Sequence, residues 1–145
     1  MKPLLLFLIL LASEKECNQK NELPFLMATS QNWSGGAAGY HGTYYKIYFI
    51  MKESADYQFD SLWTDEKRIP AVMMKNKTAS DTLMIMANDQ QGIYDPVNQR
   101  EVTNSVPSKF PIDTKAQGVL GYFYKGERKY FQVQEWKTLK ALAYP

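Results

Sequence analysis

The most constraining feature of this sequence is an alternation of apolar and polar residues over the range 42–63. Apolar side chains recur at every second position in its first half, at Tyr45, Ile47, Phe49 and Met51. The same period resumes at Tyr57 and Phe59, after the polar segment 52–56. A period of two is typical of a half-buried β-strand, whose side chains point alternately to its two faces. The range 42–63 therefore predicts two strands joined by a turn as a hairpin, with one apolar face in a core.

The opposite face of this hairpin carries aromatic and cationic side chains, namely Tyr44, Lys46, Tyr48 and Lys52. Aromatic rings that are not needed in a core can stack on sugar rings or fill a protein interface. Tyr44, Tyr48 and Trp63 are therefore our candidate ligand-binding residues. The alternative is that Tyr is a common strand residue whose hydroxyl simply reaches the surface.

Composition favours one all-β domain. The 145 residues are 45% hydrophobic and 22% charged, which are ordinary globular values, and this length supports a single core. An aromatic content of 14% favours strands, because rings fit a pleated, half-buried surface. We expect a single β-sandwich, immunoglobulin-like, or a small barrel, with about 6–8 antiparallel strands over residues 42–145.

Four further segments are expected to shape this domain. Residues 69–74 predict a short strand, and Pro70 places it at a sheet edge or at a strand start. Residues 82–87 are apolar on both faces, which predicts a strand covered on two sides. Residues 117–136 predict a second hairpin with Gly126 in its turn. The range 88–111, interrupted by three prolines, is expected to be a long loop.

The last residues leave two interpretations open. Apolar side chains recur at every third position, at Val133, Trp136, Leu139 and Leu142. This spacing fits either a closing helical turn or a twisted final strand, and the span is too short to decide between them.

The first 17 residues predict an export signal. Lys2 precedes nine consecutive apolar residues at 4–12, a run far shorter than the roughly 20 residues that span a bilayer core. Cleavage at the small pair Ala12-Ser13 gives a soluble product that begins near Glu14, and lipidation of Cys17 gives an anchored one. Cys17 is the candidate lipidation residue, although the segment 13–16 separates it from the apolar run, which is unlike a normal lipoprotein signal. A free thiol is the alternative.

Residues 18–41 are rich in Asn, Gln, Ser, Gly and Lys, and we expect a flexible polar tether there, with a short strand at 23–27 as the one ordered element. The residues after Cys17, Asn18 to Glu22, resemble the short Lys- and Glu-bearing export signal of Bacteroidetes surface lipoproteins. The layout of leader, cysteine, tether and Tyr-rich β-domain resembles the small exported proteins and lipoproteins of the Bacteroidetes. This resemblance implies a place in the periplasm, in the outer membrane or at the cell surface, and it names no activity.

Several function classes lack the residues that they need. A net charge of +2 is too small to gather nucleic acid, and contact with a membrane is expected only through a lipid anchor. One Cys excludes a disulfide framework and a thiolate cluster. His41 is the only His, so a triad or a zinc site lacks partners, and we read it as a turn residue. We assign no catalytic residue, no metal ligand and no cofactor.

The methionines are the one alternative to the absence of an assigned metal site. Met84 and Met86 share one face of a predicted strand, and Met73 and Met74 lie in the strand before it. Thioethers are soft ligands that suit Cu(I), but Met also fills irregular cores, and a core is the expectation here.

The sequence therefore predicts a non-enzymatic, envelope-associated β-sandwich that binds a protein or glycan partner through its loops and outer aromatic residues. The alternatives are a small periplasmic metal-handling protein that uses Met thioethers and a hydrolase that uses two carboxylates.

Overall fold

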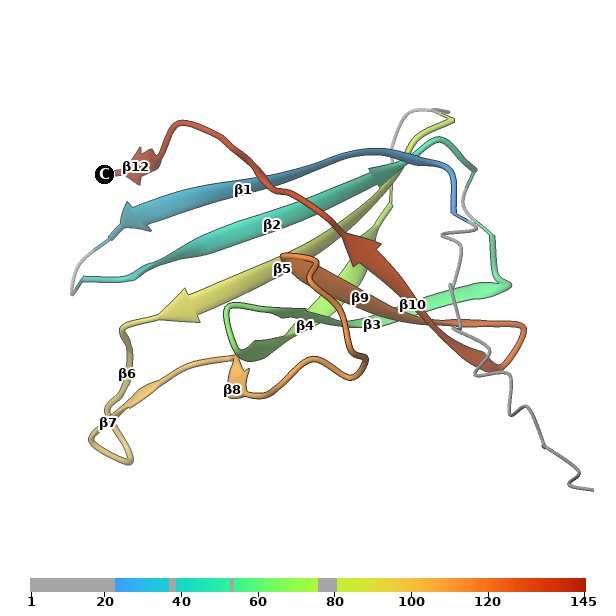
Figure 1. The fold of residues 1–145 in the computed structure, drawn as a ribbon. Helices are drawn as coiled ribbons and strands as arrows, with labels where there is room; N and C mark the ends of the chain where they lie inside the picture. The colour runs from blue at the N-terminus through green and yellow to red at the C-terminus, as the bar shows by residue number, and fades with distance from the viewer. Residues whose placement is uncertain (1–22, 37–38, 53, 76–80) are drawn as a thin grey trace, which may run out of the picture.

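The computed structural model of the chain describes residues 23–36, 39–52, 54–75 and 81–145 (Figure 1). These ranges contain strands and no helix, which confirms the predicted all-β class. The predicted leader 1–17, with Cys17, lies outside the described residues. None of the described residues belongs to a helix long and apolar enough to cross a membrane.

The strands vary in length, and the longest lie in the first two thirds of the chain. They are β1 (Phe25–Gly35), β2 (His41–Phe49), β3 (Tyr57–Thr64), β4 (Lys67–Met74), β5 (Leu83–Gln91), β6 (Ile93–Asp95), β7 (Arg100–Val102), β8 (Val106–Pro107), β9 (Gly118–Tyr124), β10 (Glu127–Val133), β11 (Lys137–Thr138) and β12 (Leu142–Tyr144).

One open, mixed sheet of ten strands contains all of these except the β6–β7 pair. Its order is β10-β9-β3-β4-β5-β2-β1-β11, with β12 also on β1 and β8 also on β4. Neighbouring strands are antiparallel, but β11 and β12 run parallel to β1. The sheet is therefore mixed, unlike the purely antiparallel arrangement that the sequence predicts.

β4 connects two halves of this sheet, β10-β9-β3 on one side and β5-β2-β1-β11 on the other. Its first half pairs with β3, from Thr64 opposite Lys67 to Ser61 opposite Pro70, and its second half, from Ala71 onward, pairs with β5. Pro70 stands where the strand changes partner, and it has no N–H to donate to a ladder. The prediction that Pro70 marks an edge strand or a strand start was wrong, because the change of partner accommodates this residue inside a strand.

The predicted hairpin over 42–63 was half right. Both strands form, as β2 and β3, but they do not pair with each other: β2 lies between β1 and β5, and β3 lies between β4 and β9. The connection 50–56 is too long for a tight two-residue turn and crosses from one half of the sheet to the other (Figure 1). The tight hairpins are β3–β4, with Asp65 and Glu66 in the turn, and the predicted β9–β10, with Lys125 and Gly126.

The core contains residues from both halves of the sheet. Its fully buried members include Ile47, Phe49, Leu62, Ile85, Leu120 and Val133. β5 alternates strictly, with Leu83, Ile85 and Ala87 buried while Met84 and Met86 are half-buried. The prediction that residues 82–87 are covered on both faces was therefore wrong, because Met84 and Met86 lie on the outer face of the sheet.

Three other expectations change at the ends of the domain. β1 occupies residues 25–35 of the expected tether 18–41, so this part of the prediction was wrong and the folded domain begins before residue 42. The expected loop 88–111 holds the end of β5, the hairpin β6–β7 and β8. The three-residue spacing after Val133 belongs to extended chain that forms β11 and β12, and no helical turn forms there.

Candidate ligand-binding site

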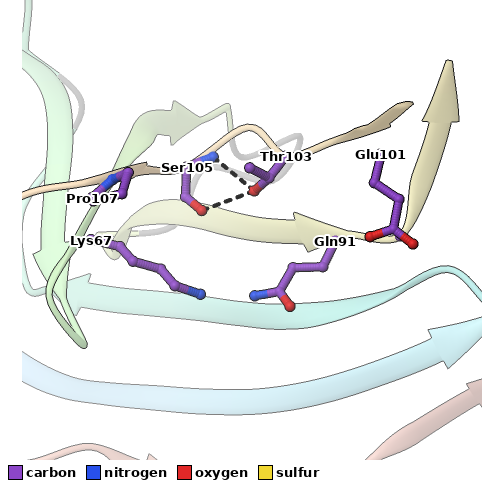
Figure 2. A pocket seen from close by; sticks show the side chains of 7 residues that line it. Lys67, Gln91, Glu101, Thr103, Ser105 and Pro107 are labelled. Atoms are coloured by element: carbon purple, nitrogen blue, oxygen red, sulfur yellow. Dashed lines mark hydrogen bonds between the residues drawn. The ribbon is translucent and has the colours of Figure 1, made fainter. Parts of the chain in front are cut away.

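A pocket of about 350 Å³ lies where β5 ends and the chain returns from the β6–β7 hairpin (Figure 2). It is lined by Lys67, Gln91, Gly92, Glu101, Thr103, Ser105 and Pro107. Figure 2 shows the Lys67 and Gln91 side chains extending toward one another, with Glu101 beyond Gln91. The lining therefore combines one cation, one anion, one amide and two hydroxyls. The volume of the pocket is at the small end of the range of about 300–1,000 Å³ for small-molecule sites.

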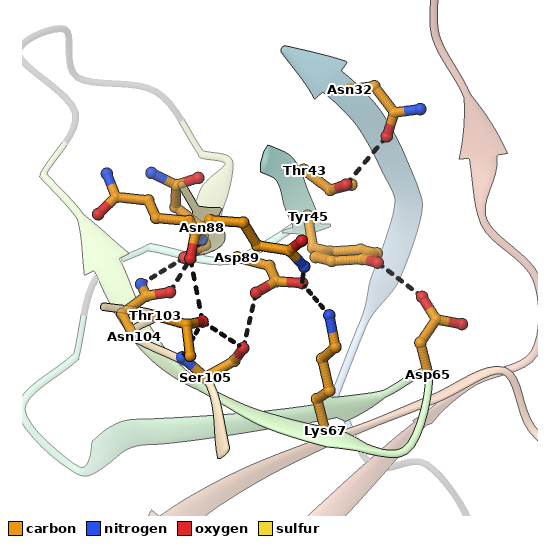
Figure 3. Close-up of polar contacts among 12 residues, drawn as sticks. Asn32, Thr43, Tyr45, Asp65, Lys67, Asn88, Asp89, Thr103, Asn104 and Ser105 are labelled. Atoms are coloured by element: carbon orange, nitrogen blue, oxygen red, sulfur yellow. Dashed lines mark hydrogen bonds and ion pairs between the residues drawn. The ribbon is translucent and has the colours of Figure 1, made fainter. Parts of the chain in front are cut away.

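Asp89 organises the wall of this pocket. It is 5% exposed, and its carboxylate accepts bonds from Lys67 Nζ at 2.9 Å and from Ser105 Oγ at 2.7 Å (Figure 3). Gln91 Nε2 donates a longer bond of 3.4 Å to the same carboxylate. A buried carboxylate needs such partners, because its charge has lost water. Asp89 thereby holds three lining side chains, from three segments of the chain, in fixed positions.

The segment 103–105 is attached to β5 by side chains instead of a backbone ladder. Asn104 donates from Nδ2 to the Asn88 carbonyl at 2.5 Å and accepts the Gln90 N–H at 2.8 Å (Figure 3). Thr103 Oγ1 donates to the Gln90 carbonyl at 3.0 Å. These bonds place Ser105 over Asp89 and so build one side of the pocket.

Tyr45 extends the polar cluster toward the β3–β4 turn. Its hydroxyl donates to Asp65 Oδ2 at 2.8 Å (Figure 3). Burial raises the pKa of Tyr45 well above its usual range, and the hydrogen bond to Asp65 and the charges of Asp65 and Asp89 raise it further. Tyr45 is therefore a neutral donor at physiological pH.

A second pocket, of about 290 Å³, adjoins the first. Its lining is Asn32, Trp33, His41, Gly42, Thr43 and Gln91, so Gln91 is common to both pockets. Thr43 Oγ1 donates to Asn32 Oδ1 at 2.9 Å. His41 Nδ1 lies 2.9 Å from the Gly39 carbonyl, which can only accept, so this nitrogen carries the proton.

Trp33, which lines the second pocket, stacks on Tyr44 on the outer face of the sheet, and we call Trp33, Tyr44 and Tyr144 the aromatic surface. The rings of Trp33 and Tyr44 stack with centroids 5.6 Å apart and planes 24° apart. Trp33 Nε1 donates to Asn88 Oδ1 at 2.9 Å, which fixes the indole across β2. Partial burial raises the pKa of Tyr44, and the neighbouring Tyr144 hydroxyl raises it further.

The three candidate residues from the sequence do not lie together. Tyr44 belongs to the aromatic surface, whereas Tyr48 lies four residues further along the same face of β2, in register with Met27 and Met84. Trp63 lies on β3 and is only 6% exposed.

Trp63 is covered by the guanidinium groups of Arg68 and Arg128, at 5.4 and 5.7 Å from its ring. Its Nε1–H donates to Ser108 Oγ at 3.2 Å. Arg128 also forms an ion pair of 2.8 Å with Asp60. Trp63 thus packs inside a cation–aromatic cluster and offers no open ring face, so it cannot serve as a platform for a ligand in this arrangement.

Two polar groups of the first pocket already have partners within the protein. Ser105 directs its proton to Asp89, whose charge is already paired with Lys67, so neither group is an activated nucleophile or base. Within the described ranges, no group of three or more His, Cys, Asp or Glu side chains is placed to hold a metal ion.

Sequence reasoning missed Trp33, Asp89 and Lys67. Trp33 sits in the Gly- and Ser-rich stretch that was interpreted as a tether, and the Lys67–Asp89 pair is separated by 22 residues. A usable signal for Trp33 was the aromatic residue itself, since a bulky ring is unusual in a flexible tether.

Comparisons of this chain with protein-family models, curated proteins and solved structures find no match.

Proposed function

We propose that this protein is a non-enzymatic binding module of the cell envelope, and that its ligand is a glycan held between the aromatic surface and the two pockets. The observation that carries this proposal is Trp33, which stacks on Tyr44 and also lines a pocket with amide and hydroxyl groups. A sugar ring has apolar C–H faces that pack on aromatic rings and hydroxyls that need donors and acceptors. Trp33 connects the two requirements, because it belongs both to the stacked aromatic pair and to the lining of the second pocket.

The second pocket supplies the polar half of this recognition. Asn32 and Gln91 offer side-chain amides and Thr43 offers a hydroxyl, and each of these groups can both donate and accept. These side chains extend from strands of the sheet or sit at their ends, so the sheet holds them in place before the ligand arrives. A preformed site pays less ordering entropy on binding, which favours affinity for a flexible ligand.

The first pocket extends the site toward charged groups. Lys67 and Glu101 stand on its lining, with Gln91 shared between the two pockets. A second sugar unit that carries a carboxylate or an amine fits this combination. The favoured ligand is therefore an oligosaccharide of at least two units, with the charged unit over Lys67 and Glu101.

A glycan is favoured over a protein partner by the size of these features. Two pockets of about 350 and 290 Å³ accept small rings. A stable protein interface needs on the order of 800 Å² per partner with a desolvated centre, and the centre of this region is polar.

The proposal also covers the architecture of the protein and its location in the cell. We propose that the two halves of the sheet, which share β4, act as the two layers of a sandwich and so leave the pockets at one end of the core. We also propose that the apolar leader directs export, and that Cys17 carries a lipid anchor. Intact mass spectrometry of the mature protein tests this: a diacylglyceryl mass on Cys17 supports the anchor, a free N-terminus near Glu14 overturns it, and retention of Met1 overturns export.

The glycan proposal is tested on an oligosaccharide array, followed by calorimetric titration of the best ligand. Trp33→Ala and Tyr44→Ala should each weaken binding about tenfold or more, since buried aromatic contacts dominate such interfaces. Tyr48→Ala is the matched control. It removes the same kind of ring from the same strand and the same face, four residues further from the pockets. It should leave affinity within about twofold.

Two results would overturn the glycan proposal. One is the absence of any bound glycan on the array. The other is equal loss of affinity in Tyr48→Ala and Tyr44→Ala, which would place the ligand along the whole face of β2 and not at the pockets. Circular dichroism of each variant separates loss of binding from loss of fold.

A further inference from the structure

Three methionines lie next to one another on the outer face of the central strands. Met74 of β4 is directly opposite Met84 of β5 in the antiparallel register. Met86 lies two residues beyond Met84 on the same face, opposite Val72 and Lys46. All three side chains are half-buried, and none belongs to the buried core cluster. Met84 and Met86 therefore do not belong to the core, where the sequence predicts them.

The backbone places these side chains at distances that three thioethers can close. Directly opposed residues have Cβ atoms about 4.5–5.5 Å apart, and diagonal neighbours about 7–8 Å. Residues two apart on one strand are separated by about 6.5 Å. Met has three rotatable side-chain bonds, so the three sulfur atoms can turn toward the centre of this triangle.

The surroundings also fit a soft monovalent cation. Lys46 is in register with Met86, but its ammonium lies 5.9 Å from the centroid of the Tyr44 ring, which directs its charge along β2 away from Met84. Tyr48 is the neighbour of Met84 on β2, and an aromatic face beside the metal favours a cation. The thioether sulfur is a soft, polarisable donor, so it binds soft ions such as Cu(I) and Ag(I) and discriminates against hard divalent ions.

We propose that Met74, Met84 and Met86 form a three-thioether site that binds one Cu(I) ion on the outer face of β4 and β5. The site is independent of the glycan site, because the two are built from different residues. Thioether ligands have an advantage outside the cytoplasm, since they do not pair into disulfides there as thiolates do.

The test is a titration with Ag(I), a soft d¹⁰ ion of the same charge that needs no reductant, followed by native mass spectrometry. The thiol of Cys17 would bind the same ion, so every measurement uses the full chain in a Cys17→Ser background. One equivalent of Ag(I) should bind. Anaerobic competition for Cu(I) with a coloured chelator then gives the affinity.

The variant Met74→Leu/Met84→Leu/Met86→Leu should bind at least about tenfold more weakly, because Leu keeps the volume and removes the sulfur. The matched control is Met51→Leu/Met73→Leu, which changes two methionines that pack against the core instead of the outer face. The control should retain one equivalent. If the triple variant unfolds, Met84→Leu and Met86→Leu alone should each weaken binding. No binding by the parent chain, or equal affinity in the triple variant and the parent, would overturn the proposal.

Discussion

Phe49 of β2 and Phe131 of β10 meet at an angle of 87°, with ring centroids 5.0 Å apart. Four strands of the sheet, β9, β3, β4 and β5, separate β10 from β2 in the hydrogen-bonded order. The contact is therefore made across the core and not along the sheet. Phe49 and Phe131 belong to one apolar core to which strands on both sides of β4 contribute.

Replacing Phe131 by Ala should lower the free energy of unfolding by about 3–5 kcal/mol, because the cavity removes contacts from both halves of the sheet. Phe131 is 2% exposed and also packs against Phe25, with centroids 5.4 Å apart. Phe25→Ala is the control: its ring is 45% exposed, so it should cost about 1 kcal/mol. Urea denaturation gives both values, and similar losses in the two variants would argue against a shared core at Phe131.

The Lys67–Asp89 pair predicts a strong asymmetry between breaking and replacing a buried ion pair. Asp89 keeps only 8% of its side chain exposed and Lys67 keeps 34%. Lys67→Met leaves a buried carboxylate without its cation and should cost about 2–3 kcal/mol, at or below the range for a fully buried pair. The double variant Lys67→Met/Asp89→Leu should cost less than the sum of the two single changes.

The exposed pair Lys52–Asp81 is the control for this measurement. Its atoms are 3.7 Å apart and its side chains are 83% and 76% exposed. Lys52→Met should change stability by no more than about 0.5 kcal/mol, because water screens such pairs. If Lys52→Met lowered the free energy of unfolding as much as Lys67→Met, the burial of Asp89 would not determine the cost of breaking its ion pair.

Tyr45 should make the protein sensitive to alkali. Its pKa is raised in the folded state, so above the ordinary Tyr pKa of 10.0 the unfolded chain loses this proton before the folded one does. Stability from this group is fully present below pH 10.0 and falls as the pH rises beyond it. Tyr45→Phe should cost about 1 kcal/mol at neutral pH, through the lost bond to Asp65.

The same variant should show a shallower loss of stability above pH 10.0, measured by denaturant unfolding at several pH values. Tyr44, whose pKa is also raised, still titrates in the variant, so the slope should decrease without vanishing. Parallel curves for the two proteins would show that Tyr45 does not carry the alkaline transition.

The sequence identified strand interiors better than strand partners. The alternation at Tyr45, Ile47 and Phe49 predicts their burial correctly, because pleating alone decides which side chains share a face. Pairing depends on where connections lead, and nothing local shows that the segment 50–56 crosses between the halves of the sheet. β1 was predicted only at its start, as part of a strand at 23–27, because only Ala28 and Thr29 in it are buried and the strand carries no clear alternation.

The candidate site was still harder to predict. Tyr44 was named from its exposed face on β2, but its stacking partner Trp33 lies on β1, a strand that was not expected at full length. Asp89 was one of many scattered carboxylates. Its role depends on Lys67 and Ser105, which the fold brings from other strands and loops and which no spacing marks.

The two tight hairpin turns predict stability changes of opposite sign from one cause. Both turns hold their two central residues at positive φ: 49° and 57° at Asp65 and Glu66, and 49° and 80° at Lys125 and Gly126. L side chains are strained there and glycine is not. Gly126→Ala should therefore destabilise by about 1 kcal/mol, although its new Cβ would meet nothing within 4 Å.

Glu66→Gly should stabilise the protein by up to about 1 kcal/mol, because it relieves the strained position and makes the Asp-Gly pair that this turn type prefers. The bond from Ser108 N–H to the Glu66 carbonyl, at 2.9 Å, uses the backbone and survives the change. Thermal melting should show a lower midpoint for Gly126→Ala and a higher one for Glu66→Gly. Since both side-chain changes are exposed, shifts of the same sign in the two variants would exclude backbone strain as their common cause.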